Sequence, residues 1–314
     1  MPTLLDYRRR IRSVKSTQQI TRAMKFISAA KLRRAQEGVF AARPYAGEIL
    51  RVMRSAAARM ESAAHPLLER RPEERILVVV LTGDRSLAGA FNTNVIRRAV
   101  QFIQENSSKK SQMIAIGKKG RDTLRKRGWQ IAGEYLNVSA KVDFSIAKEI
   151  AGRIAQMYAA REVYAVYAVY NEFKNVMVQK LRTAKLLPID PAVLDSGAEG
   201  EAGTSASIRD EHGDALPTDL SASGKSRLVD YIYEEPVEEI FSGLVPRYLE
   251  AEVFRILLES AAAEHAARMT AMDSATRNAS DLIDALTLDM NKIRQASITK
   301  ELIEIVSGAA SAKS

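Results

Sequence analysis

The feature that most constrains this chain is a C-terminal stretch of about sixty residues that contains no helix-breaking residue. Between Pro246 and Gly308 there is neither proline nor glycine, and alanine, leucine, glutamate and arginine dominate. These four residue types are strong helix formers. A helix of this length spans roughly 90 Å at 1.5 Å per residue, which is far more than a small core can cover. It must therefore lie along another long helix of the same chain or run through a partner.

One apolar row runs through the middle of this stretch in alternating steps of three and four residues. The row consists of Met269, Met272, Thr276, Ala279, Ile283, Leu286, Met290 and Ile293. This period is typical of a helix that packs along another helix. We expect the coiled-coil helix to occupy residues 236–311, starting at Pro236 and interrupted at Gly243 and Pro246.

Residues 1–62 are expected to form the second long helix. Thr3 and Asp6 have the spacing of a capping box, which predicts a helix start. Apolar residues at heptad spacing follow, namely Leu4, Tyr7, Ile11, Val14, Leu32, Ala35, Val39, Ala42, Ala46, Ile49, Met53, Ala56 and Met60. Pro44 lies inside this run and is expected to kink or split the helix.

Four successive positions of the same row are polar. They are Gln18, Thr21, Lys25 and Ser28. Burying a leucine or isoleucine is worth roughly 1.5–3 kcal/mol, so this window forgoes much of the pairing energy. Either the seam shifts to Ile20, Met24 and Ile27, or the window faces something other than its partner helix.

Residues 73–233 follow a different pattern, in which short apolar runs alternate with amphipathic ones. The run 76–81 is continuously apolar, as expected of a parallel strand that is buried on both faces. Further strands are expected at 113–116, 131–136, 163–170, 176–187 and 228–233, and helices from Asn92, at 118–127 and from Asp143 or Ser145. The alternation predicts a Rossmann-like, mostly parallel α/β domain, with 176–187 as a charged antiparallel edge strand.

The acidic, low-complexity insert 195–224 interrupts this domain and cannot bury enough apolar surface to order itself. The chain leaves the domain near residue 60 and returns near residue 236, so the two long helices must run antiparallel. The predicted fold is an antiparallel two-helix coiled coil, built from the N- and C-terminal segments, with a central α/β foot and a bare stalk.

Candidate catalytic residues are scarce. The chain has no cysteine, and the three histidines, His65, His212 and His265, have no metal-ligand spacing. The loop 83–89 follows the first strand, but Arg85 stands where the dinucleotide-binding pattern needs its second glycine. We interpret this loop as a structural turn, and we expect no catalytic, cofactor-binding or metal site.

The formal net charge of +9 points to an acidic partner. Phe26 is the only aromatic residue between Tyr7 and Phe40, so the basic first helix lacks base-stacking platforms and we expect no nucleic acid. The basic side chains of this helix form either a solvated face or a basic ring of residues that faces acidic protein loops. No apolar run approaches the length of a membrane span and no secretory signal is present, so we expect a soluble, uncleaved chain.

Three motifs resemble the gamma subunit of F-type ATP synthases. They are ITRAMK at 20–25, continuing to residue 35; TGDRSLAGAFN at 82–92; and EHAARM at 264–269, continuing through RQASITKE at 294–301 to residue 309. The resemblance covers nearly all of the chain apart from the insert. It implies a non-catalytic rotor whose coiled coil turns inside a ring of alpha and beta subunits. The foot then stands on the c-ring beside the epsilon subunit, peripheral to the cytoplasmic face of a bacterial inner membrane. Proton flow turns the ring and drives the beta subunits in sequence through ATP synthesis.

The resemblance also implies contact residues. Those near the alpha/beta ring are Met24, Lys25, Arg268, Arg294, Gln295, Thr299 and Glu301, and those on the c-ring and epsilon side are Tyr231, Tyr233 and Glu234. Chloroplast relatives carry a redox dithiol where the insert lies, but this chain has no cysteine. The insert is then an unstructured decoration or a weak brake on hydrolysis.

Two other classes of protein remain open at this point. One is a small α/β enzyme with a coiled-coil dimerisation arm, which nucleotide binding by the isolated chain would support. The other is a basic coiled coil for nucleic acid or a membrane surface, which steep salt dependence of DNA binding would support.

Overall fold

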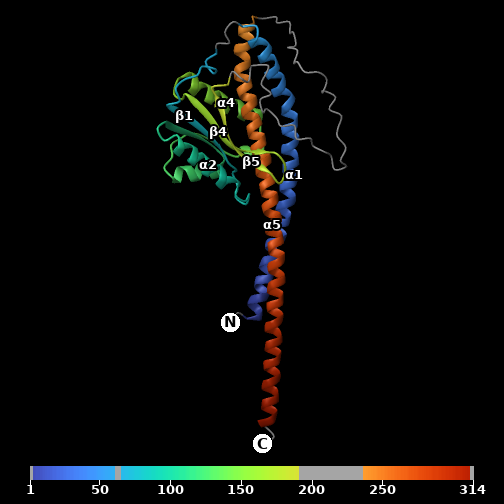
Figure 1. Ribbon diagram of the computed structural model, residues 1–314. Coiled ribbons are helices and arrows are strands. Elements are labelled where there is room, and N and C mark those ends of the chain that lie inside the picture. Colours follow the sequence, from blue (N-terminus) through green and yellow to red (C-terminus); the bar gives the residue numbers. More distant parts are fainter. Residues whose placement is uncertain (1–2, 61–64, 191–235, 312–314) are drawn as a thin grey trace.

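The computed structural model describes residues 3–60, 65–190 and 236–311 (Figure 1). Two long helices, α1 (Leu4–Ala57) and α5 (Val237–Ser311), form a shaft, and an α/β domain, here called the foot domain, lies beside it near one end. The other elements are β1 (Arg75–Leu81), α2 (Phe91–Glu105), β2 (Lys110–Ile116), α3 (Lys118–Lys126), β3 (Ile131–Tyr135), the 3-10 turn η1 (Val138–Ala140), α4 (Phe144–Ala159), β4 (Ala165–Phe173) and β5 (Gln179–Leu187). The predicted combination of a two-helix coiled coil and a central α/β domain is confirmed.

The two shaft helices run antiparallel, as predicted. Thr21 contacts Thr276, whereas Gly38, further along α1, lies against Leu258, which comes earlier in α5. Helix α5 has 75 residues and α1 has 54. The C-terminal end of α5 therefore continues alone beyond the N-terminus of α1 (Figure 1).

Neither proline nor glycine interrupts the shaft helices, so the predicted breaks at Gly243 and Pro246 are wrong. Helix α5 runs through both residues, and α1 runs through Pro44 without being split. A proline in a helix interior costs about 3 kcal/mol. Burial of Phe241, Val245 and Leu249 on α5 contributes roughly 1.5–3 kcal/mol per side chain and offsets this cost.

The helix start of α1 is formed as predicted. The Asp6 backbone N–H donates to the Thr3 hydroxyl, and the Thr3 backbone N–H donates to the Asp6 carboxylate at 2.9 Å. This capping box satisfies two backbone donors that the first turn leaves without a helical partner.

The polar window of α1 stays in the seam, so the predicted shift of the seam to Ile20, Met24 and Ile27 is wrong. Thr21 and Ser28 are buried, and the Thr21 and Thr276 hydroxyls lie 2.8 Å apart. Ile20 and Ile27, the expected replacements, are 58% and 57% exposed. The window pairs with complementary polar residues on α5, which the α1 sequence by itself does not reveal.

Within the described residues, the sheet has five strands in the order β3-β2-β1-β4-β5. The first four strands are parallel, and β5 pairs antiparallel with β4 at one edge, as predicted for the charged strand. Helices α2 and α3 cover one face through an apolar cluster that includes Val78, Val95 and Leu124. The other face carries α4 and the first part of α5.

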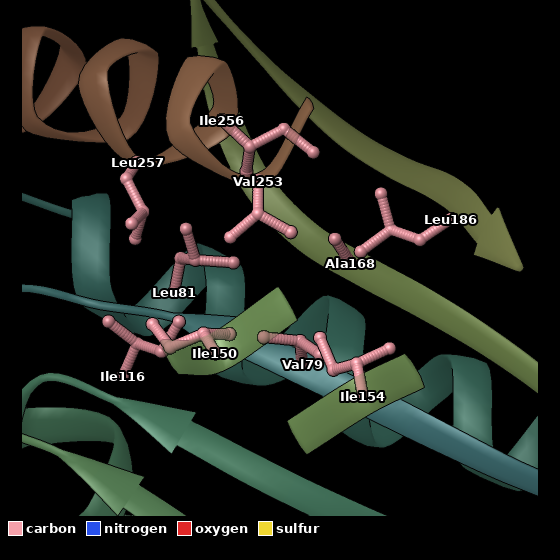
Figure 2. A pocket seen from close by; sticks show the side chains of 10 residues that line it. All are labelled: Val79, Leu81, Ile116, Ile150, Ile154, Ala168, Leu186, Val253, Ile256 and Leu257. Atoms are coloured by element: carbon pink, nitrogen blue, oxygen red, sulfur yellow. The ribbon is translucent and has the colours of Figure 1, made fainter. Parts of the chain in front are cut away.

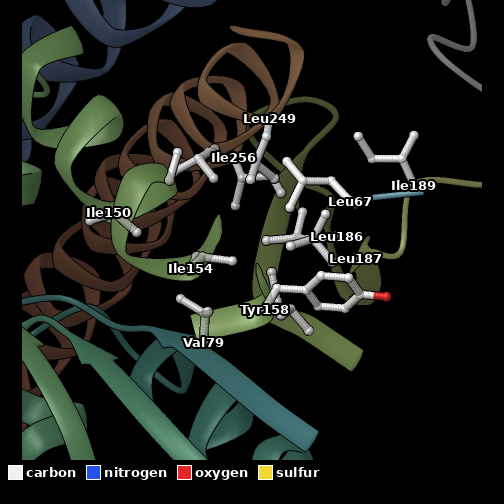
Figure 3. Close-up of a cluster of buried hydrophobic side chains, with 14 of the residues drawn as sticks. Leu67, Val79, Ile150, Ile154, Tyr158, Leu186, Leu187, Ile189, Leu249 and Ile256 are labelled. Atoms are coloured by element: carbon white, nitrogen blue, oxygen red, sulfur yellow. The ribbon is translucent and has the colours of Figure 1, made fainter. Parts of the chain in front are cut away.

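The first part of α5 belongs to the core of the foot domain. Phe241, Val245, Leu249, Val253 and Ile256 are buried in one cluster with the strands and α4. Figure 3 shows part of this cluster, in which α5 side chains meet residues from the strands and α4. The expectation of a bare stalk is therefore wrong for this part of the helix, and the shaft and foot domain share one core.

Some predicted features lie outside the described residues. These are the insert 195–224 and the strand 228–233. In the described part of the chain, no helix combines the length and the apolar character that crossing a bilayer requires.

Candidate functional site

The resemblance-based residues on the shaft divide into three groups. In the first, Met24 and Lys25 lie on α1 and are partly exposed. The Lys25 ammonium is 2.5 Å from Asp273 of α5, and this hydrogen bond lowers the pKa of the Asp273 carboxyl. Arg277, which also contacts Asp273, adds to that effect. Lys25 therefore has a partner within the shaft.

The second group is Arg268, which the resemblance places near the alpha/beta ring and which is buried in the isolated chain. It donates to a Glu264 carboxylate oxygen at 2.6 Å, and the two side chains are only 9% and 4% exposed. The buried His265 lies beside the pair, and its pKa is lowered to about 4, chiefly by burial and then by Arg268. His265 is therefore neutral near pH 7.

The third group lies where α5 continues alone. Arg294, Gln295, Thr299 and Glu301 are all exposed. Between them lie apolar residues that were not predicted as contact residues and are at least half exposed, namely Ile298, Leu302, Ile303 and Ile305. A signal for them was available, since the helix predicted at 236–311 is longer than the helix predicted at 1–62 that could cover it. Tyr231, Tyr233 and Glu234 lie outside the described residues.

Helix α5 fills the crevice where a fold of this kind places a ligand. In doubly wound sheets, ligands bind beyond the carboxyl ends of the strands, where strand order reverses, which is between β1 and β4 in this sheet. Here Ala263 and Ala267 of α5 pack against Ala88 and Phe91 after β1 and against Phe173 at the end of β4. Side chains of the chain's own helix α5 therefore fill the crevice.

Gly83 shows how closely α5 approaches this loop. A Cβ atom on Gly83 would lie 2.6 Å from the carboxyl carbon of Glu264 and 2.7 Å and 2.9 Å from its two oxygens. A larger residue at position 83 would therefore displace the Glu264 carboxylate from this position. The carboxylate lies over the backbone of the loop, where the dinucleotide-binding pattern would place a pyrophosphate.

The loop itself is fixed by hydrogen bonds to neighbouring strand ends. The Thr82 hydroxyl accepts from the Gly120 N–H at 2.8 Å, and the Asp84 carboxylate accepts from the N–H groups of Lys118 and Asn137, each at 3.0 Å. Gly117 has a φ of +90°, and a Cβ there would collide with the Thr82 carbonyl oxygen at 2.0 Å. These contacts lie within the chain, which fits the interpretation of 83–89 as a structural turn.

Two hollows in the described part of the chain differ in their chemistry. The first, of about 10 Å³, is enclosed by apolar side chains between the sheet, α4 and α5 (Figure 2). It holds at most one water-sized probe, so it is a packing void. The second, of about 380 Å³, is lined by Arg70, Arg71, Glu73, Lys185, Pro188 and Asp190.

The charges around the second hollow pair with one another. Arg70 lies 3.1 Å from Asp190, and Lys185 lies 2.8 Å from Glu73. Although burial raises the pKa of Glu73, hydrogen bonds from Lys185, Lys109 and Tyr167 lower it to about 2. No group of three or more potential metal ligands occurs among the residues that the structure describes.

Comparison with known proteins identifies the family. A family model described as ATP synthase matches residues 3–312. The ATP synthase gamma chain of Solibacter usitatus is 50% identical over 317 aligned residues, which cover 100% of both chains. The chain belongs to the ATP synthase gamma chain family. The gamma chain of Pelotomaculum thermopropionicum is 46% identical, with 99% of each chain covered.

Solved structures share the fold of this family member. A chain from the Euglena gracilis mitochondrial ATP synthase, in a structure of OSCP, F1 and the c-ring, has a TM-score of 0.63 at 22% identity. The match covers 98% of this chain and 94% of the other. A chain from the central stalk and c-ring of the Tetrahymena thermophila enzyme has a TM-score of 0.55 at 22% identity, with 82% and 99% covered.

Proposed function

We propose that this chain is the central rotor stalk of an F-type ATP synthase and that it has no active site of its own. The observation that carries the proposal is the unaccompanied end of α5. A helix of 75 residues spans about 110 Å, and its last part has no second helix beside it (Figure 1). Exposed apolar side chains at that end, including Leu302 and Ile305, are typical of a surface that a partner covers.

The partners follow from the family. We infer that the alpha and beta subunits surround the shaft, and that the foot domain stands on the c-ring beside the epsilon subunit. Proton-driven rotation of the c-ring then turns the shaft, and each shaft angle favours one conformation of each beta subunit. Because such coupling is reciprocal, ATP hydrolysis in the ring drives the shaft backwards. The complex is peripheral to the cytoplasmic face of a bacterial inner membrane.

Contact residues are proposed group by group. Met24, Lys25, Arg294, Gln295, Thr299 and Glu301 contact the alpha/beta ring, and Tyr231, Tyr233 and Glu234 contact the c-ring or epsilon subunit. Arg268 acts indirectly, because its guanidinium is buried against Glu264. Exposed ion pairs are worth about 0–1 kcal/mol each, so we expect the load to be shared along the shaft.

Two features support the absence of catalysis. Helix α5 occupies the crevice at the strand ends, and the Glu264 carboxylate lies against Gly83, the residue that a bound phosphate would have to approach. The acids and bases around the larger hollow pair with each other. A small α/β enzyme with a coiled-coil arm would need an open site at one of these places.

Co-purification tests the proposal. The tagged chain is co-expressed with the other subunits of its synthase, and the captured complex is analysed by native mass spectrometry. We expect two kinds of nucleotide-binding subunit in a three-to-three ring around one copy of this chain. Capture of no ring subunits, together with nucleotide binding or steeply salt-dependent DNA binding by the isolated chain, would refute the rotor assignment.

A further inference from the structure

One contact between the foot domain and α5 lies at the carboxyl ends of the strands. Ala88 and Phe91 pack on Ala263 there, and a Cβ on Gly89 would lie 3.7 Å from the Ala271 side chain. We call this contact between residues 82–91 and residues 263–271 of α5 the collar. Towards the C-terminus, the polar contacts of α5 run to α1, as between Asp273 and Lys25.

The foot-domain side of the collar is rigid. Asp84 accepts hydrogen bonds from the backbone at the starts of the segments that follow β2 and β3, at Lys118 and Asn137. The Gly83 N–H donates to the Asn92 side chain at 2.8 Å, at the start of α2. The ends of β2 and β3 and the start of α2 are thereby tied to the loop that receives α5.

The polar group on the shaft side of the collar is the Glu264 carboxylate. Glu264 is 3% exposed, lies against the Gly83 backbone on one side and accepts from Arg268 at 2.6 Å on the other. Replacing a buried ion pair by apolar residues is often neutral or stabilising, so stability alone does not explain such a pair. The apolar contacts elsewhere in the shared core are non-directional. The Glu264 carboxylate, by contrast, fits between Gly83 and Arg268 in one orientation of the foot domain relative to α5.

We propose that Glu264, held by Arg268 over Gly83, is the positioning residue that fixes the angle of the foot domain about the shaft. The apolar contacts of the shared core hold foot and shaft together, and the collar sets their relative angle when torque passes between them. This inference rests on the proposed rotor function. It adds a joint within the chain, distinct from the surfaces that contact other subunits.

Gly83→Ala tests the joint in the complete synthase, reconstituted in membrane vesicles. The new methyl group displaces the Glu264 side chain without altering any charge. ATP hydrolysis and ATP-driven proton uptake are measured together, and we expect hydrolysis to persist while proton uptake per ATP falls about twofold or more, within the range of coupling between contacting residues. Gly152→Ala on α4 is the matched control, since a Cβ there meets no atom within 4 Å.

A double-mutant cycle assigns the effect to the carboxylate. Glu264→Ala removes the atoms that the methyl group introduced by Gly83→Ala would meet, so Gly83→Ala should cause no further loss in that background. The proposal would be refuted if Gly83→Ala took up as many protons per ATP as the wild-type complex. It would also be refuted if the losses from Gly83→Ala and Glu264→Ala simply added in the double variant. A wild-type complex that hydrolyses ATP but never pumps would instead contradict the rotor function.

Spin labels provide a readout that does not depend on assembly. The chain has no cysteine, so the substitutions Lys126→Cys on α3 and Asp281→Cys on α5 provide two unique labelling sites. In the isolated full-length chain, Gly83→Ala should shift or broaden the distance distribution between foot and shaft. An unchanged distribution would refute the proposal even if the variant failed to assemble.

Discussion

Arg268→Ala and Lys25→Ala each remove one cation from the shaft, and we expect very different losses of stability. The Arg268 and Glu264 side chains are 9% and 4% exposed, whereas those of Lys25 and Asp273 are 39% and 30% exposed. Removing one partner of a buried pair leaves an uncompensated charge and costs about 3–5 kcal/mol. A solvent-screened pair is worth about 0.2–1 kcal/mol. Residues that the family resemblance treats alike are thus separated by their burial.

Urea unfolding of the isolated chain, followed by far-UV circular dichroism, measures this difference. With a slope of about 3 kcal/mol per M, Arg268→Ala should lower the midpoint by about 1–1.7 M and Lys25→Ala by less than about 0.3 M. Glu264→Met combined with Arg268→Met removes both charges and should recover most of the loss. Equal midpoints for Arg268→Ala and Lys25→Ala, or no recovery in the double variant, would refute the reasoning.

Three further predictions follow from other sites. The pKa of Glu73 is lowered from 4.5 to about 2, so its stabilisation of about 3 kcal/mol is fully present above pH 4.5 and is lost as the pH falls towards 2. Glu73→Gln should make the urea midpoint less dependent on pH over this range. A pH dependence equal to that of the wild-type chain would contradict the assignment. Thr82→Val leaves the buried Gly120 N–H without its acceptor and should cost about 1–3 kcal/mol by thermal unfolding, whereas Thr82→Ser should cost less. Leu302→Asp and Ile305→Asp change exposed residues, so the stability of the isolated chain should shift by less than about 0.5 kcal/mol while co-purification with ring subunits weakens. Undiminished capture of the ring would show that this end has no partner.

Periodicity predicted the layers of this molecule well because burial follows secondary structure. The continuous apolar run 76–81 became a central strand buried on both faces, and the charged run 176–187 became the antiparallel edge. The capping box at Thr3 and Asp6 involves neighbours in sequence, so no long-range information was needed. Local signals sufficed wherever the deciding contacts were local.

The wrong predictions all depended on contacts between distant parts of the chain. Pro246 remains helical because α5 packs into the foot-domain core, which a breaker rule does not consider. Thr21 stays in the seam because Thr276 lies opposite, and that register is fixed only when both helices pack. The burial of Arg268 against Glu264 is a feature that no prediction covered, because it depends on how the foot domain folds around α5.

The alanine-rich part of α5 links the closed crevice to the long shaft. Ala262, Ala263, Ala266 and Ala267 favour a helix by propensity. The small side chains of Ala263 and Ala267 let α5 lie close to the strand ends, and Ala262 and Ala266 pack in a cluster with Leu32 of α1. Larger residues would hold the helix away and reopen the crevice between β1 and β4. The helix that projects from the foot domain is therefore the same one that closes its ligand crevice. A chain built in this way gives up a ligand site at the strand ends and gains a supported base for its shaft, which is the arrangement that a rotor requires.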